Sequence, residues 1–320
     1  MLYFVAIFGA IVAGVLASIT QPAFSFRRRS TSGLGLADPE LLERYVRVIS
    51  TEFVPRDERH PEGLDRAARY IAAEFRQYSG RVREQVFELG GVEYRNVIAS
   101  FGPENGERIV VGAHYDADGP FPGADDNASG VAGLLELARL LSLEPPSGRI
   151  DLAAYSLEEV GDFQSGVYGS GVHARSLKDQ GAKVKAMISL EMIGYFSDAP
   201  ESQGYPIPGL RFIYPATGNF IAVVGKLDQP RLVRRIKHAM IGATRSLAVR
   251  SINAPTQLAG VTLSDHVNFW QAGYPAVMIT DTAFYRNKAY HTAFDSWDRL
   301  DYDKMAEVID GVFAAIQELS

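Results

Sequence analysis

The chain has 320 residues, of which 47% are hydrophobic, and its formal net charge is −6. A chain of this length can bury a sizeable core, as one large domain or two small ones. Its charged residues are scattered, and no basic stripe points to nucleic acid as a partner. Cysteine is absent, which excludes disulfides and leaves only nitrogen and oxygen ligands for any metal.

The first 29 residues differ from the rest of the chain. Residues 2–19 (LYFVAIFGAIVAGVLASI) are apolar or small and carry no charge, and a bilayer span needs roughly 20 such residues. Residues 15–17 (VLA) would suit signal-peptide cleavage, although no basic residue precedes the apolar run. The arginines at 27–29 would place the following domain in the cytoplasm by the positive-inside rule. We expect residues 1–29 to be a hydrophobic signal or membrane anchor with a basic flank. The side of the membrane on which the following domain lies stays open.

The remaining chain alternates between strand and helix patterns. Residues 30–38 are predicted to be a linker, followed by one domain over 39–320. Helices are predicted at 39–50, 63–79, 128–142, 166–180, 230–247, 265–273 and 301–319. Strands are predicted at 81–89, 92–101, 108–113, 149–157, 184–190, 219–225 and 275–280. This alternation predicts an α/β fold with a mostly parallel sheet covered on both faces. The Pro-, Gly- and Tyr-rich segment 196–219 is expected to be a long functional loop.

Several polar side chains follow the predicted strands, where ligands gather in open α/β sheets. They are His114 after 108–113, Glu158 and Glu159 after 149–157, Glu191 after 184–190, His291 beyond 275–280, and Asp126 before a helix. Two histidines with several carboxylates form a nitrogen and oxygen set that suits zinc. We therefore expect these residues to meet at one rim of the sheet.

The number of candidate ligands suggests two ions. A single catalytic zinc needs three protein ligands and an open position, and five candidates are present. If Asp126 bridges, each ion receives one histidine, one terminal carboxylate and a share of Asp126. Two ions about 3.5–4 Å apart can clamp a substrate oxygen and lower the pKa of a water. Glu158 is then left over, and a carboxylate beside such a water is a natural general base.

Six motifs, in the same order along the chain, resemble those of the co-catalytic zinc aminopeptidases. This family contains enzymes like the bacterial leucyl aminopeptidases and also the animal glutaminyl cyclases. The motifs are AHYD, GADDNASG, LEEVG, LEMIG, LSDHVNFWQAGYPAVM and YHTAFDSWDRLD, spread over roughly residues 45–319. The resemblance implies a single zinc-exopeptidase catalytic domain over 39–320, with a central mixed sheet between helices and peptides as substrates. For a bacterial protein of this kind, residues 1–29 indicate the inner membrane or the periplasm.

The resemblance also implies a role for each matching residue. The zinc ligands would be His114, Asp126, Glu159, Glu191 and His291, with Asp126 bridging two ions. Glu158 would be the general base, and Asp116 the carboxylate that orients His114. Tyr290 matches a position where some members use a tyrosine to stabilise an oxyanion. The peptide bond between Asp126 and Asn127 is expected to be cis.

Two positions leave alternatives open. Most family members have aspartate where this chain has Glu191, and the extra methylene could change metal affinity or identity. Asp265 matches a residue close to the substrate in the glutaminyl cyclases. Capping of the following helix by Ser264 or Asp265 is the structural alternative.

Three functions follow from these patterns. The leading one is a two-zinc aminopeptidase that hydrolyses N-terminal residues of peptides. The second is a glutaminyl-peptide cyclotransferase with one zinc, although the Asp-Asn pair of GADDNASG fits the hydrolases better. The third is a non-catalytic, receptor-like protein, which the filled ligand and base positions disfavour. Side-chain preference, a dipeptidase or carboxypeptidase activity and the oligomeric state stay open.

Overall fold

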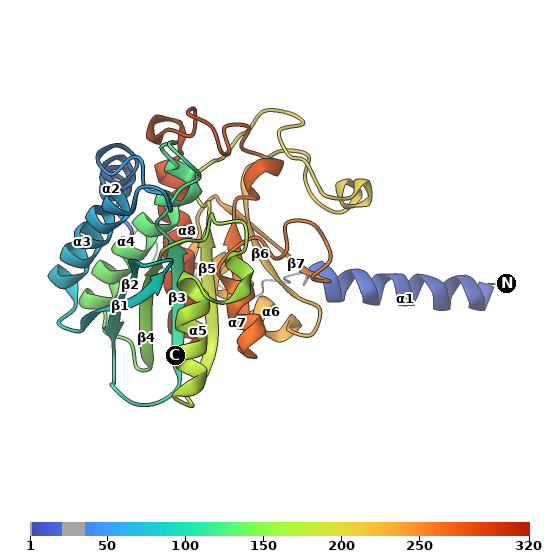
Figure 1. The fold of residues 1–320 in the computed structure, drawn as a ribbon. Coiled ribbons are helices and arrows are strands. Elements are labelled where there is room, and N and C mark those ends of the chain that lie inside the picture. Colours follow the sequence, from blue (N-terminus) through green and yellow to red (C-terminus); the bar gives the residue numbers. More distant parts are fainter. Residues whose placement is uncertain (1, 21–35) are drawn as a thin grey trace.

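The computed structural model describes residues 2–20 and 36–320, and its centre is one eight-stranded sheet between two layers of helices (Figure 1). The strands in spatial order are β1 (Val82–Leu89), β2 (Val92–Phe101), β4 (Arg149–Tyr155), β3 (Arg108–His114), β5 (Val184–Glu191), β8 (Ala276–Thr280), β6 (Phe220–Lys226) and β7 (Ala248–Ala254). The four central strands β4, β3, β5 and β8 run parallel. Because β2 and β6 join this group antiparallel, the sheet is mixed, as expected.

The parallel centre decides where polar side chains meet. The carboxyl ends of β3, β4, β5 and β8 lie at the same edge of the sheet, and β3 and β5 end on His114 and Glu191 themselves. Such an edge is where ligands bind in open α/β sheets.

Each face of the sheet carries its own helices and its own apolar cluster. One layer contains α2 (Pro39–Glu52), α3 (Pro61–Tyr78), α4 (Gly130–Leu143), α6 (Pro230–Ala243) and α8 (Tyr302–Leu319), and the other α5 (Gly169–Asp179) and α7 (His266–Ala272). The side chains of β3 alternate between the two clusters, because neighbouring residues of a strand point to opposite faces. Val111 packs in the first cluster and Val110 in the second.

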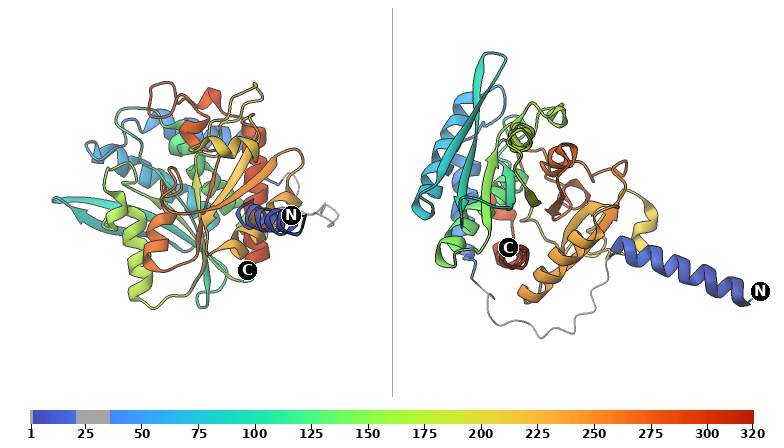
Figure 2. Two further views of the ribbon diagram at one scale, coloured as in Figure 1. Left: turned by 90° about the vertical axis from the view of Figure 1, so that its right-hand side faces the viewer. Right: turned by 90° about the horizontal axis from the view of Figure 1, so that it is seen from below.

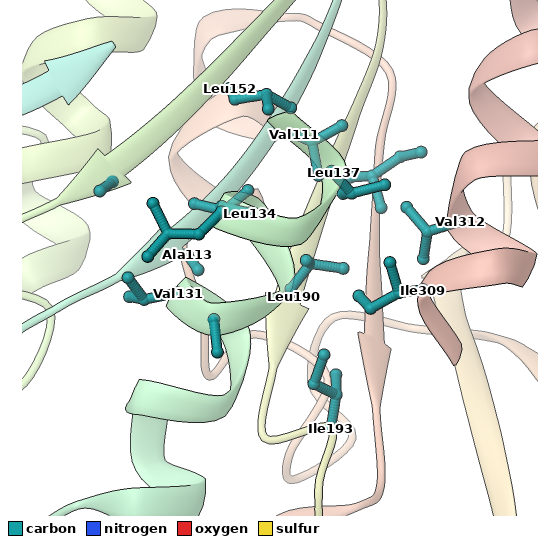
Figure 3. Close-up of a cluster of buried hydrophobic side chains, with 14 of the residues drawn as sticks. Val111, Ala113, Val131, Leu134, Leu137, Leu152, Leu190, Ile193, Ile309 and Val312 are labelled. Carbon is teal, nitrogen blue, oxygen red and sulfur yellow. The ribbon is translucent and has the colours of Figure 1, made fainter. Parts of the chain in front are cut away.

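The larger cluster fixes α4 and α8 against the sheet (Figure 3). Leu134 of α4 and Ile309 of α8 are fully buried there, together with Val111 and Leu190 from the strands. Full burial of one such side chain contributes about 1.5–3 kcal/mol. The stripe predicted on the last helix is confirmed, since its members are all buried: Met305, Val308, Ile309, Val312, Phe313 and Ile316.

One strand was missed by the sequence patterns. The helix predicted over 230–247 is too long: α6 ends at Ala243, and the chain returns along the sheet edge as β7. The buried positions of β7 include Ser251 and Asn253 as well as Val249. This strand therefore lacks the apolar alternation by which a half-buried strand is recognised.

The N-terminal helix α1 (Leu2–Thr20) projects from the side of the molecule where β7 lies (Figure 2). The Thr20 carbonyl accepts hydrogen bonds from Ser251 Oγ (2.8 Å) and Lys237 Nζ (2.9 Å). Most of the linker predicted at 30–38 lies outside the described residues. Within the described ranges no helix has the length and apolar character to cross a membrane, so the span expected over residues 2–19 is not found. The expected membrane association stays a prediction.

Candidate metal centre

The structure brings the predicted ligands together at the carboxyl edge of the parallel strands. His114 ends β3, Glu191 ends β5, and Glu159 lies just beyond β4. Asp126 lies in the turn η1 (Ala124–Ser129), which leads into α4 and is kinked at Asp126, where the backbone is not helical. His291 lies in the loop beyond β8. The bond between Asp126 and Asn127 is cis, which confirms that expectation.

The five residues form two groups that share Asp126: His114 with Glu191, and Glu159 with His291. His114 Nε2 lies 3.4 Å from Asp126 Oδ1 and 3.4 Å from Glu191 Oε2. His291 Nε2 lies 3.1 Å from Asp126 Oδ2 and 3.2 Å from Glu159 Oε2. In each group the candidate ligand atoms lie within 4.8 Å of one another. The two oxygens of Asp126 therefore face different histidines.

Unsatisfied polar atoms show that this donor set fits metal ions. Both ring nitrogens of His114, Nε2 of His291 and Oε1 of Glu159 are buried and make no hydrogen bond in the structure. Buried polar atoms are nearly always paired, so a group of unpaired ones calls for an ion or another partner. Imidazole nitrogens with carboxylate oxygens suit zinc.

The pKa shifts of the candidate ligands also fit a site for cations. Burial, reinforced by Asp126, raises the pKa of Glu159 to about 8, and burial also raises the pKa of Glu191. Burial alone would lower the pKa of His291, but contacts with Asp126 and Glu159 raise it to about 10. Without cations, the raised pKa values favour protonated carboxyls at Glu159 and Glu191 and a protonated ring at His291. Metal ions would take the place of those protons.

Glu158 lies at the same rim but in neither group of ligands. The strand β4 has ended at Tyr155, and Leu157 has a positive φ of 64°, so Glu158 and Glu159 no longer alternate as strand neighbours. Burial raises the pKa of Glu158 well above its usual value, with His114 opposing the shift and Glu191 adding to it. Glu158 is therefore close to the ligands while its carboxylate stays available for a proton.

Further polar groups contact three of the candidate ligands, His114, Glu159 and Glu191. Asp116 Oδ1 lies 3.4 Å from His114 Nδ1, and Asp116 Oδ2 accepts a hydrogen bond from the Glu159 amide at 2.9 Å. Ser264 Oγ donates to Glu191 Oε2 at 2.7 Å and lies 2.7 Å from Ser189 Oγ. Ser264 thus holds the same oxygen of Glu191 that faces His114 Nε2.

Helix capping does not explain Ser264 or Asp265. Neither side chain caps α7, because the Ser264 hydroxyl contacts Glu191 and the Asp265 side chain makes no capping hydrogen bond. Asp265 is buried, its Oδ2 has no hydrogen-bond partner, and burial raises its pKa to about 7. Its charge also contributes to the raised pKa of Glu158, so Asp265 belongs to the surroundings of the site.

Tyr290 contacts the candidate metal centre and also lines a cavity beside it. Its ring stacks on the His291 ring with 3.7 Å between centroids. Tyr290 and Glu191 both line the cavity, whose other walls come from β6, β7, β8 and the loops 203–214, 258–263 and 282–285. Burial, with contributions from Asp126 and Glu159, raises the pKa of Tyr290, so its phenol keeps its proton. The loop expected to be functional therefore forms part of a cavity beside the centre.

Sequence reasoning missed Arg56, a fully buried arginine beneath the loop that carries Asp126. Its guanidinium donates hydrogen bonds to the carbonyls of Tyr115 (2.8 Å), Pro122 (2.5 Å) and Gly123 (2.7 Å). Burial lowers the pKa of Arg56 to about 10, although the carboxylates of Asp116 and Asp295 oppose this. Arg56 joins the end of β3 to η1 through the backbone, and no local pattern around it signals this role.

Residues distant in the sequence also form hydrogen bonds with the turn around Asp126. Asp295 accepts hydrogen bonds from the amides of Asp125 (3.1 Å) and Asp126 (3.0 Å). Asn127 Nδ2 donates to the Leu190 carbonyl at 2.8 Å, and its Oδ1 accepts from the Met192 amide at 3.0 Å. These bonds tie η1 to the strand end that carries Glu191, so the two ligands keep a fixed separation.

Comparison with known proteins places the chain in a peptidase family. Residues 96–316 match the sequence model of Peptidase family M28. The protein YfbL of Escherichia coli (strain K12) is 47% identical over 288 residues, which cover 88% of either chain. Leucine aminopeptidase 1 of Fusarium vanettenii is 27% identical over 71% of this chain, which spans 55% of that protein's length. A glutaminyl cyclase of Bacteroides thetaiotaomicron, at 22% identity, shares the fold with a TM-score of 0.65 over 88% of this chain and 97% of its own.

Proposed function

The chain belongs to peptidase family M28, and on that premise we propose that it is a zinc aminopeptidase with a two-ion centre. The observation that carries the proposal is the position of Asp126, whose two oxygens face two separate groups of donors. His114 and Glu191 would hold one ion, and Glu159 and His291 the other, with Asp126 shared. A cyclase with one zinc would need only one of these two groups.

The residues around the ligands supply the proton transfers of peptide hydrolysis. Bound zinc contributes Lewis acidity, which lowers the pKa of water and polarises a carbonyl. Glu158 takes a proton as the water oxygen adds to the carbonyl carbon, and passes it to the amine nitrogen as the C–N bond breaks. Glu158 lies in neither group of candidate ligands, so its carboxylate is free to hold this proton between the two steps.

Tyr290 is placed to stabilise the negative charge on the carbonyl oxygen. Its phenol retains its proton, and Tyr290 lines the cavity next to Glu191. A hydrogen bond donated at that position strengthens as the carbonyl oxygen becomes an oxyanion. The stacked His291 ring keeps the Tyr290 ring in place.

The proposal is tested by assaying three peptides with the full chain, after zinc removal and after zinc is restored. One peptide has a free N-terminal leucine, the second is its N-acetylated form, and the third begins with glutamine. We expect release of the first residue from the peptide with free N-terminal leucine and none from its acetylated form, with the activity lost in chelator and restored by zinc. Ammonia release from the glutaminyl peptide would indicate a cyclase, and C-terminal cleavage of the blocked peptide a carboxypeptidase. Failure to bind zinc would indicate a receptor-like protein.

A further inference from the structure

A row of paired residues runs across the sheet from the metal centre to its edge. Glu191 of β5 pairs with Thr280 of β8, Thr280 with Ala222 of β6, and Ala222 with Arg250 of β7. All four line the cavity beside Tyr290. Directly paired residues point to the same face, and strands lie ~4.8 Å apart, so the Cα atoms of Glu191 and Arg250 are about 14 Å apart. The row thus forms one side of the cavity, with Arg250 at the end far from the ligands.

The cavity is apolar between these two ends. Its walls include the side chains of Leu210, Tyr214, Phe220, Val261, Met278 and Phe284. Among the described residues that line it, only Glu191 and Arg250 carry a charge. A side chain that enters from the metal centre would therefore cross apolar surface and then meet a guanidinium.

Arg250 has no carboxylate partner within the described part of the chain. Its side chain is exposed, and none of the ion pairs between described residues includes it. Its neighbours are the phenols of Tyr205 and Tyr214 and the ammonium of Lys237, whose lowered pKa of about 8 is due to burial and, to a lesser extent, to Arg250. No carboxylate of the described residues therefore neutralises the positive charge at this end of the cavity.

We propose that Arg250 is a specificity residue that favours N-terminal side chains with a negative charge at their far end, such as glutamate, and disfavours lysine. This inference rests on the proposed aminopeptidase function. The methylenes of glutamate would lie along the apolar walls, and its carboxylate would be directed toward the guanidinium. The alternative is that Arg250 only protects β7, an edge strand, from pairing with other chains.

The test compares kcat/KM for the amides of methionine, glutamate and lysine, which are similar in length and differ in charge. Arg250→Met should lower the glutamate-to-methionine ratio by about fivefold, the size of an exposed ion pair, and raise the lysine-to-methionine ratio by a similar factor. Arg250→Lys should keep most of the wild-type selectivity. Arg231→Met removes an exposed arginine outside the cavity and should leave both ratios unchanged.

The outcomes separate this inference from the proposed function. If the wild-type protein with zinc hydrolyses none of the three amides, the aminopeptidase proposal itself is wrong. If it hydrolyses the methionine amide and both ratios stay within twofold in Arg250→Met, Arg250 only protects the strand edge and the specificity inference is overturned. Should Arg250→Met fail to fold, Arg250→Gln removes the charge and keeps a polar side chain.

Discussion

The two oxygens of Asp126 are directed to two different histidines: Oδ1 lies 3.4 Å from His114 Nε2, and Oδ2 lies 3.1 Å from His291 Nε2. A carboxylate in this position is common to both groups of ligands. Replacing Asp126 by alanine should therefore lose both zinc ions, whereas Glu191→Ala or Glu159→Ala should each weaken mainly one site. Zinc per chain, measured after equilibration and desalting, checks this. Asp198→Ala, which removes an exposed carboxylate, is the control. A full two ions retained in Asp126→Ala would disprove the shared role.

Glu158 and Glu159 are sequence neighbours with different expected roles. Glu158→Gln keeps the shape of the side chain and leaves both groups of ligands intact, so zinc content should be unchanged. Turnover should fall by about 10²–10⁴-fold, the usual contribution of a general base. Glu159→Gln should instead lower zinc content first, because Glu159 belongs to the group with His291. Equal metal loss in the two variants, or near-normal turnover in Glu158→Gln, would mean that the roles are assigned wrongly.

Ser264 is expected to set the position of Glu191. Ser264→Ala removes the 2.7 Å hydrogen bond to Glu191 Oε2 and should weaken zinc binding by about 10- to 100-fold. The effect should fall on the ion held by His114 and Glu191, and a competition titration with a chelator measures it. Ser142→Ala removes an exposed serine hydroxyl on α4 and is the matched control. Unchanged affinity in Ser264→Ala would show that Glu191 holds its position without this hydroxyl.

Arg56 should contribute to the free energy of unfolding. Arg56→Met leaves the buried carbonyls of Tyr115 and Gly123 and the half-buried carbonyl of Pro122 without their donor, at a cost of about 3–5 kcal/mol in the free energy of unfolding. Urea unfolding of the metal-free protein measures this loss. Arg66→Met, at an exposed position of α3, should change stability by less than about 0.5 kcal/mol. A loss in Arg56→Met as small as in that control would contradict the account of Arg56.

The buried His173 should make the free energy of unfolding depend on pH. It is buried beside Tyr155, whose hydroxyl lies 2.9 Å from His173 Nδ1, and burial lowers its pKa from 6.5 to about 3. Because the folded-state pKa is the lower one, the stability contributed by neutral His173 is complete above pH 6.5 and lost as the pH falls toward 3. His173→Asn should make the fall in unfolding free energy less steep by about 1.4 kcal/mol per pH unit in this range.

Urea unfolding at several pH values in the presence of chelator tests this prediction without a contribution from metal. Identical slopes for wild-type protein and His173→Asn would show that His173 does not titrate between the two states in this way.

Sequence patterns predicted the features that are determined by neighbouring residues in the chain. Ile309 and its stripe on α8 follow from helical periodicity, and His114 and Glu191 follow from their places directly after buried strands. Contacts between distant segments were not predictable in this way. Arg56 lies 67 positions from Gly123, and Ser264 lies 73 positions from Glu191, so no local spacing connects them. The strand β7 was missed because its buried positions are partly polar, so its type was decided by pairing with β6.

The sharing of Asp126 by two metal ions can be observed in crystals of the full chain equilibrated with zinc. X-ray data at the zinc absorption edge locate each ion by its anomalous scattering. We expect two anomalous peaks about 3.5–4 Å apart, one beside His114 and Glu191 and the other beside His291 and Glu159, with Asp126 between them. A single peak, or two peaks of which only one contacts Asp126, would contradict this expectation.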